Sequence, residues 1–212
     1  MRFNRATAAI VASTVASFAV AAPASPAAAH TTGTRSLAAV LTADKSGFDR
    51  NGRDFDILTA AVQAVLKAKP NSAVGVLADG KVALTAFIPN DLAFRKLVAD
   101  IQHTRRLPGE KKAFTAVAGL GIDTVESVLL YHVVPGATIN RKAALKADGA
   151  RLTTAAGSAI KVDVYGHYWK RIKLIDADRS DRDPRVIKFD VNKGNRQIAH
   201  GIDRVLRPID LP

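Results

Sequence analysis

The spacing of apolar residues changes near residue 150, and this change limits the folds open to the chain. Before it, apolar residues recur every three or four positions, as in a helix predicted over residues 56–69. After it, apolar and polar residues alternate, which is typical of strands. Helices therefore collect in the first half and strands in the second, and this order predicts an α+β fold with a mainly β core. The predicted strands are residues 151–154, 159–165, 171–175, 186–191 and 198–206.

Turn and cap residues divide the first half further. Two apolar runs, residues 73–77 and 82–88, flank an Asp-Gly pair and predict a hairpin. Helices are expected to begin at short polar side chains, whose oxygens accept hydrogen bonds from free N–H groups in the first turn. The predicted caps are Asn90 with Asp91, Asp123 with Glu126 (an Asp version of the capping box), and Asn140, which opens a short helix that ends at Gly149.

The N-terminus has the three parts of an export signal. Arg2 and Arg5 supply positive charge, a run of apolar and small residues follows, and small residues before His30 suit a signal peptidase. A membrane anchor is the alternative, but the apolar stretch is short and no charged stop follows it. No second long apolar run occurs, so no transmembrane segment is expected in the mature chain. The predicted organisation is a signal peptide over residues 1–29, cut between Ala29 and His30, a flexible leader over 30–46 and one domain over 47–212.

Composition narrows the partners and the chemistry. The chain has no cysteine, which excludes disulfides, thiolate metal sites and thiol nucleophiles. Its formal net charge is +12, and removal of Arg2 and Arg5 would leave +10, so an exported protein would meet anionic wall polymers or acidic polysaccharides. Nucleic acid suits this charge but not the extracellular compartment, and it is not expected. Signatures of serine hydrolases, zinc proteases and phosphate-binding loops do not occur in the sequence.

Three segments, in this order and spacing, resemble the signature of fasciclin (FAS1) domains. The first segment, residues 85–94, runs from a strand through a proline into a helix that starts with Ala-Phe. The second, residues 130–136, holds a Tyr-His pair, and the third, residues 195–208, closes the domain. The resemblance covers residues 47–212 and is to secreted, bacterial-type proteins with a single such domain. It implies a β-wedge or barrel-like sheet with helices packed on one side. It also implies cell–cell or cell–matrix adhesion through protein or carbohydrate partners, with Tyr131 and His132 as candidate partner-binding residues.

Two interpretations of Tyr131 and His132 remain open. The resemblance assigns them to partner binding, whereas their neighbours on both sides are apolar, and a His in such surroundings usually satisfies a buried backbone group. The same structural interpretation applies to His200 and Asp203 near the C-terminus. A secreted, carbohydrate-active hydrolase that uses these His and Asp side chains is a second hypothesis, although no activated nucleophile lies beside them in the sequence.

The segment from Tyr165 to Lys173 is the other candidate binding site. It holds two of the three tyrosines and the only tryptophan, mixed with cations, and Gly166 suits a hairpin tip. Exposed rings beside Lys and Arg suit sugar stacking, an anionic polymer or a protein contact. Alternatively, Tyr165 and Trp169 pack inward, as alternate strand residues do. The candidate binding residues here are Tyr165, His167, Tyr168, Trp169, Lys170 and Arg171. The basic loop over residues 102–112 is more typical of solvated charge.

Two acidic segments resemble parts of a calcium-binding loop without completing it. Residues 176–183 lack its turn glycine and its final glutamate, and Arg179 and Arg182 are expected to neutralise the carboxylates. Residues 49–52 are a second partial match, and both segments are interpreted as solvated loops, so no metal and no cofactor are expected. The leading hypothesis is a monomeric, non-catalytic adhesion or envelope-interaction module. The hydrolase, and a structural secreted protein without a tight ligand, are the alternatives.

Overall fold

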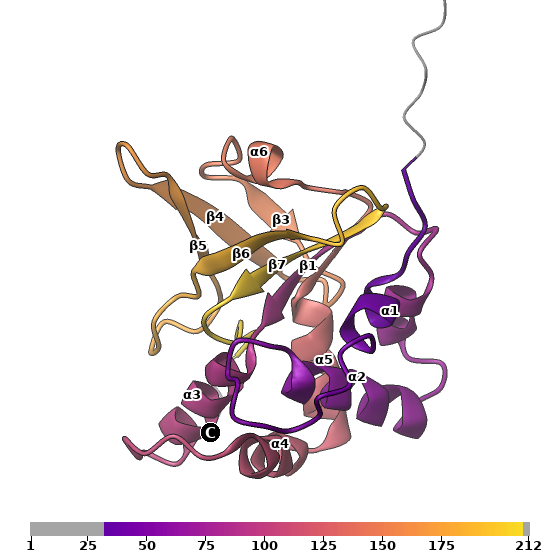
Figure 1. Cartoon of the computed structure of the whole chain (residues 1–212). Helices are drawn as coiled ribbons and strands as arrows, with labels where there is room; N and C mark the ends of the chain where they lie inside the picture. Colours follow the sequence, from indigo (N-terminus) through magenta and orange to yellow (C-terminus); the bar gives the residue numbers. More distant parts are fainter. Residues whose placement is uncertain (1–31, 210–212) are drawn as a thin grey trace, which may run out of the picture. The chain divides into compact units, whose positions relative to one another are not determined.

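The computed structural model describes residues 32–209, so the predicted signal peptide and its cut between Ala29 and His30 lie outside the described residues (Figure 1). The helices are α1 (Leu37–Leu41), α2 (Asp56–Ala68), the 3₁₀ helix η1 (Ala73–Ala78), α3 (Asp91–Ile101), α4 (Glu110–Ala118), α5 (Ile122–Tyr131) and α6 (Arg141–Ala144). The strands are β1 (Leu84–Pro89), β2 (Val133–Pro135), β3 (Arg151–Thr153), β4 (Ala159–Tyr165), β5 (Arg171–Ile175), β6 (Val186–Val191) and β7 (Gln197–Ile202). The α+β prediction is confirmed.

The strands form two sheets. The first has the order β2-β1-β7-β6, in which β1 runs parallel to β7 while β2 and β6 are antiparallel to their neighbours. The second is the antiparallel sheet β3-β4-β5. An isolated bridge between Lys173 and Arg185 links the sheets at β5 and the start of β6. All five strands predicted in the second half are present, although β7 ends at Ile202, and the sheets within residues 32–209 do not close into a barrel.

Two hydrophobic cores hold these layers together. Helices α2 to α5 gather at one end, beside the four-stranded sheet (Figure 1), and their apolar faces meet it in the first core, which includes Ile57, Val65 and Leu97. The second core lies between the two sheets and includes Tyr131, Ile160 and Leu174. Strand β1 contributes to both cores and is buried along its whole length. Its run of apolar residues follows from burial on both faces.

The predicted hairpin over residues 73–88 is wrong in its first strand. Residues 73–78 form η1, whose start is capped by Ser72 Oγ, which accepts from Val74 N. The buried side chain of Gln197 donates from Nε2 to the carbonyl oxygens of Val76 and Asp79, both at 2.7 Å. These carbonyls are therefore satisfied by a distant side chain rather than by a strand partner, and only β1 joins a sheet.

The segment predicted as a flexible leader is attached to the domain. Leu37 and Leu41 of α1 are buried in the first core, and Leu37 N donates to Gln197 Oε1 at 2.7 Å. Gly33 also forms a parallel bridge with Asn195. The leader prediction fails over residues 33–41 because two apolar residues and several backbone groups find partners in the fold, while residues 30 and 31 lie outside the described part.

The predicted helix caps have mixed outcomes. Asn90 and Asn140 each accept from the backbone N–H three residues later, so these caps are confirmed. The capping box of Asp123 and Glu126 is wrong, because both carboxylates bind Lys69 at the end of α2 and α5 starts without a side-chain cap. Helix α4 occupies the end of the loop expected over 102–112, and the short helix after Asn140 ends at Ala144 instead of reaching 149.

Among residues 32–209, no single helix is long and apolar enough to cross a membrane. Helices α4 and α5 pass that test of length and composition only as a pair, which is bent by 106°.

Candidate functional site

The tip of the β4–β5 hairpin, residues 166–170, is the most exposed aromatic surface among the described residues. The strands pair antiparallel up to Tyr165 and Arg171, and the chain then turns over the five residues between them. Gly166 has φ +93°, and a Cβ at this position would lie 2.5 Å from the Trp169 carbonyl oxygen. Only glycine adopts that backbone conformation without strain while letting the other side of the turn approach so closely. Gly166 at a hairpin tip is as predicted.

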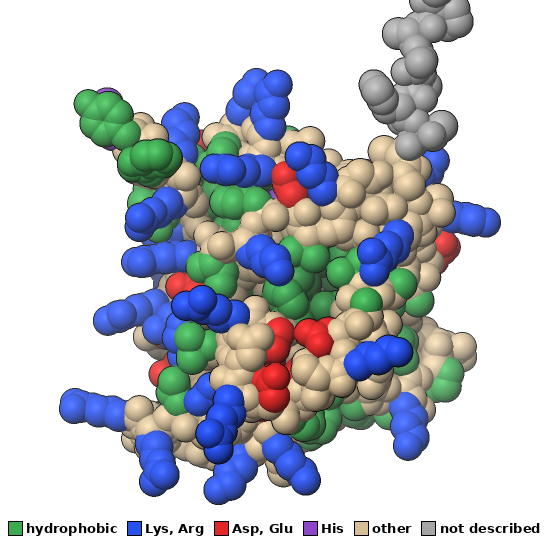
Figure 2. Space-filling model, in the orientation of Figure 1, with side chains coloured by type: hydrophobic (Ala, Val, Ile, Leu, Met, Phe, Trp, Pro, Cys, Tyr) green, Lys and Arg blue, Asp and Glu red, His purple; other side chains and the backbone are tan. Residues whose placement is uncertain are grey.

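Tyr168 and Trp169 point into solvent, with 88% and 84% of their surface exposed. The next large apolar side chains on the described surface reach only 61% and 53%, at Ile209 and Ile187. The tip of the hairpin lies at the upper left of Figure 1, and apolar side chains project at the same corner in Figure 2. The inward alternative therefore fails for Trp169. Tyr165 is half-buried, in keeping with its place at the end of β4.

Cations accompany these rings. Lys170 and Arg171 are exposed, and within residues 32–209 neither has an ion-pair partner. Lys173, further along β5, lies 3.2 Å from Asp163 and 3.4 Å from Asp183, so its charge is already balanced. The His167 ring meets the Tyr168 ring edge-on, with centroids 4.6 Å apart. The tip thus offers aromatic faces together with two uncompensated positive charges.

Tyr131 and His132 lie away from this tip and are buried. Tyr131 is fully buried in the core between the sheets, and its hydroxyl donates to Ala159 O at 3.4 Å. His132 Nδ1 donates to Val128 O at 2.7 Å, and its Nε2 accepts from Leu206 N at 2.9 Å. Burial lowers the pKa of His132 to about 4, so the ring is neutral and both nitrogens are occupied. In this conformation a partner on the surface reaches neither side chain.

The His and Asp side chains of the hydrolase hypothesis are also each engaged in hydrogen bonds of their own with the backbone. His200 Nε2 lies 2.8 Å from Ile139 O, its Nδ1 accepts from Asp190 N, and burial lowers its pKa. Asp203 accepts from Arg185 N at 2.7 Å. Among residues 32–209, no carboxylate hydrogen-bonds to the ring of His132 or His200, so a base held by an acidic partner is not assembled from these residues.

The two acidic segments differ in how their charge is balanced. In the segment over 176–183, Asp178 and Asp181 bind Arg207, Asp181 also binds Arg204, and Asp183 binds Lys173. The cations thus come from β5 and the C-terminal segment rather than from Arg179 and Arg182 as predicted. The segment near residue 49 joins a group of buried carboxylates that the sequence interpretation missed. Only the Asp49-to-Gly52 pattern signalled it, because Asp91 and Glu110 are distant in the sequence, at the starts of α3 and α4.

A family model for the fasciclin domain matches residues 56–208. The chain belongs to the fasciclin domain family. A solved structure of a FAS1 domain pair from the insect cell adhesion molecule Fasciclin I is similar, with 15% identity and a TM-score of 0.44. That match covers 72% of this chain and 43% of the insect chain, so this chain spans less than half of its length. No curated protein sequence matched the chain. The family predicted from the three sequence segments is confirmed.

Proposed function

We propose that this fasciclin domain is a secreted adhesion or envelope-interaction module, not an enzyme, and that the β4–β5 hairpin tip is its contact surface. Fasciclin domains occur in cell adhesion proteins such as the insect molecule. The exposure of Tyr168 and Trp169 beside Lys170 and Arg171 is the observation that carries the proposal. Large apolar side chains held in solvent contribute nothing to either core, and such side chains beside uncompensated cations are typical of binding surfaces.

The partner we propose is an extracellular protein, a carbohydrate or an anionic envelope polymer, bound by a monomer. Aromatic faces stack on sugar rings, and Lys and Arg attract carboxylate or phosphate groups. The formal charge of +12 acts in the same direction over longer distances. Lys and Arg side chains are spread over the face drawn in Figure 2. This distribution suits non-covalent binding of the protein to a polyanion or to a cell wall.

Export through the signal peptide, with cleavage between Ala29 and His30, is part of the same proposal. For Tyr131 and His132 we propose an indirect role in binding. Tyr131 packs in the same core as Ile172 and Leu174 of β5, and so supports the base of the hairpin. His132 links α5 to the C-terminal segment. Their replacement would alter partner binding through the fold rather than through direct contact.

The test is a pull-down of the purified protein by intact cells and isolated envelope polymers over a salt series. The double variant Trp169→Ala/Arg171→Ala is expected to lose at least tenfold in binding, because it removes a stacking ring and a cation. Its free energy of unfolding should stay within about 1 kcal/mol of the original, as for surface sites.

The matched control is Leu107→Ala/Arg106→Ala, which also removes one exposed apolar side chain and one arginine, but from the loop between α3 and α4, outside the hairpin. Binding retained by the control and lost by the tip variant supports the proposal. Equal loss in both variants, or binding abolished by moderate salt in all proteins, would mean that net charge alone causes retention. Full binding by the tip variant would exclude the hairpin as the contact surface.

A further inference from the structure

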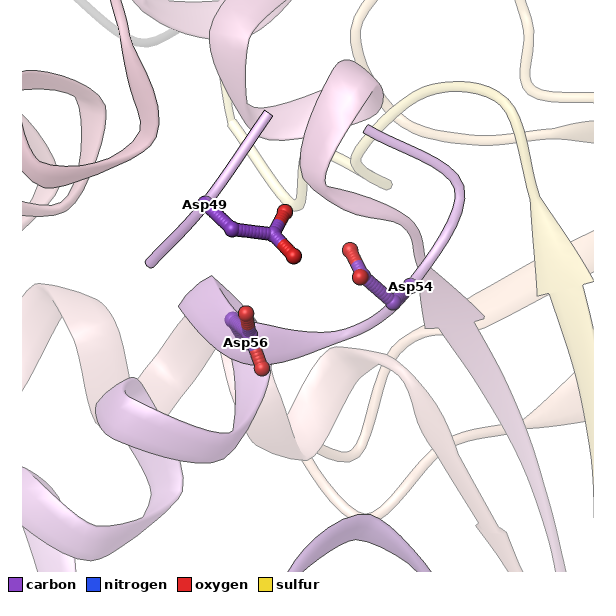
Figure 3. A group of neighbouring side chains, drawn as sticks. All are labelled: Asp49, Asp54 and Asp56. Atoms are coloured by element: carbon purple, nitrogen blue, oxygen red, sulfur yellow. The ribbon is translucent and has the colours of Figure 1, made fainter. Parts of the chain in front are cut away.

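Five carboxylates gather where three helices begin. Asp49 and Asp54 lie in the loop before α2, and the others are the first residues of α2, α3 and α4. Figure 3 shows Asp49, Asp54 and Asp56 turned toward one another from the loop and the start of α2. Except for the exposed Asp49, all are buried, and Glu110 is only 2% exposed. The group, called the acidic cluster below, consists of Asp49, Asp54, Asp56, Asp91 and Glu110.

Hydrogen bonds to backbone N–H groups near the helix starts explain why two of these carboxylates are buried. Asp91 accepts from Asp56 N at 3.1 Å and from Ile57 N at 2.8 Å, so it caps α2 from the start of α3. Glu110 Oε2 accepts from Asp49 N at 2.6 Å and fastens the loop to α4. Carboxylates are favoured at helix N-termini, where free N–H groups and the helix dipole supply positive charge. These bonds engage one oxygen of Glu110 and both oxygens of Asp91.

Asn51 donates to one oxygen each of Asp49 and Asp54, but three buried oxygens of the acidic cluster have no partner. Asp54 Oδ1, Asp56 Oδ2 and Glu110 Oε1 are buried and accept no hydrogen bond. Within the described residues no Lys, Arg or His forms an ion pair with the acidic cluster, and the nearby Arg95 donates from Nε to Pro108 O. Elsewhere the chain supplies a cation to a buried carboxylate, as Arg207 does for Asp178. Buried charge without a partner is costly, so these oxygens indicate a missing positive ligand.

The spacing of the oxygens suits a metal ion. Asp49, Asp54 and Asp56 each offer an oxygen within 4.8 Å of the others, and so do Asp54, Asp91 and Glu110. Two ligands of one calcium ion, each at about 2.4 Å, cannot lie more than about 4.8 Å apart. All donors are carboxylate oxygens, which hard cations prefer and zinc or copper sites rarely use alone. Without a cation, burial and the neighbouring carboxylate of Asp54 raise the pKa of Asp91 to about 8.

We propose that Asp49, Asp54 and Asp56, on the solvent side of the acidic cluster, bind one calcium ion. Asp91 and Glu110 form the second oxygen group with Asp54 and position the site, because Asp91 holds the start of α2 and Glu110 holds the amide of Asp49. The exposed Asp49 leaves one side open to solvent, through which the ion enters and where water completes its coordination. Bound calcium cross-links the loop to the start of α2, and so stabilises the helical end of the domain.

The experiment measures calcium binding to the full chain after removal of metal with EDTA. Calorimetric titration with calcium chloride should show one saturable site. The melting temperature should rise by about 5–10 °C when calcium is a hundredfold above the dissociation constant. Magnesium at the same concentration should give a smaller rise, because it requires a tighter octahedral arrangement. An equal response to magnesium would overturn the assignment to calcium.

Two variants separate a calcium site from general charge effects. Asp56→Asn removes one negative charge, so in EDTA it should melt at or above the temperature of the original protein, yet lose the rise caused by calcium. The control Asp183→Asn removes a carboxylate that already has Lys173 as its partner, and it should keep the full calcium response. No rise in the original protein would show that protons rather than calcium balance the acidic cluster. An undiminished rise in Asp56→Asn would show that calcium binds elsewhere, and would overturn the proposed site.

Discussion

The side chain of His132 joins the last turn of α5 to the segment after β7, through hydrogen bonds to Val128 O and from Leu206 N. Those two bonds require a neutral ring that carries its proton on Nδ1. A protonated ring would place a second N–H against the amide of Leu206 inside the protein. The residue therefore acts in stability, and its charge state connects stability to pH.

Acid should destabilise the protein through His132. Its pKa is about 4 in the folded state against an ordinary value of 6.5, so between these values the unfolded state binds more protons. Stability from this group is full above pH 6.5 and is lost as pH falls toward 4, by on the order of 3 kcal/mol. His200 acts in the same direction, whereas Asp176, whose pKa burial raises to about 7, acts in the opposite one.

The measurement is the free energy of unfolding of the original protein and of His132→Gln between pH 7 and pH 4. The variant should be less stable at pH 7 by about 1–3 kcal/mol, because buried backbone groups lose a partner. The gap should narrow as pH falls, since glutamine does not titrate. A gap that stays constant over this range would contradict the neutral, buried assignment of His132.

The β4–β5 hairpin is the element on which the proposed function depends. Its strands are anchored at the base by Ile160, Ile172 and Leu174 in the second core, while its tip carries no core residue. Five antiparallel residue pairs hold the strands in register up to Tyr165 and Arg171. The tip can therefore vary in side chain without loss of the fold, provided that the turn itself keeps its conformation.

Gly166→Ala tests that condition. The positive φ and the approach of the Trp169 carbonyl oxygen should make the change destabilising by about 1–3 kcal/mol and should displace Tyr168 and Trp169. The expected readouts are a lower melting temperature and reduced polymer binding. Gly75→Ala is the control, because its added Cβ would only reach ordinary contact at 3.8 Å from Leu66 and should change neither. Unchanged stability in Gly166→Ala would contradict the described turn.

At the scale of the whole molecule, the folded unit begins before the residues matched by the family model. Leu37 is buried in the first core, and its amide is held by Gln197 of β7. The same Gln197 side chain donates to two carbonyls of η1 and its C-terminal end. The N-terminal segment, η1 and β7 are thus joined through one buried side chain.

Leu37→Ala should destabilise the domain by about 2–5 kcal/mol, as for other buried leucines replaced by alanine. Chemical denaturation is the measurement, and a single transition is expected because both cores share β1. Val40→Ala on the same helix is the control, since Val40 is only half-buried and should cost much less. A loss near zero for Leu37→Ala would restore the interpretation of residues 33–41 as a leader.

The sequence by itself determined the division into a helical first half and a mainly β second half, the α+β class and the family. Periods of 3.6 and 2 residues are local properties, so α2 and the strands from β3 to β7 could be predicted within a few residues. Asn90 and Asn140 were predictable for the same reason, because a cap bonds only three residues along the chain. The hairpin tip was also located, since glycine, aromatic residues and cations are adjacent in the sequence.

Only the tertiary structure decided how distant side chains are used. Gln197 replaces a strand partner for η1, Lys69 draws Asp123 and Glu126 away from a capping box, and Trp169 turns outward. The acidic cluster could not be predicted, because its members are up to 61 positions apart and meet only when three helices start at the same place. Their chemistry depends on burial and mutual distance, which packing sets and local spacing does not.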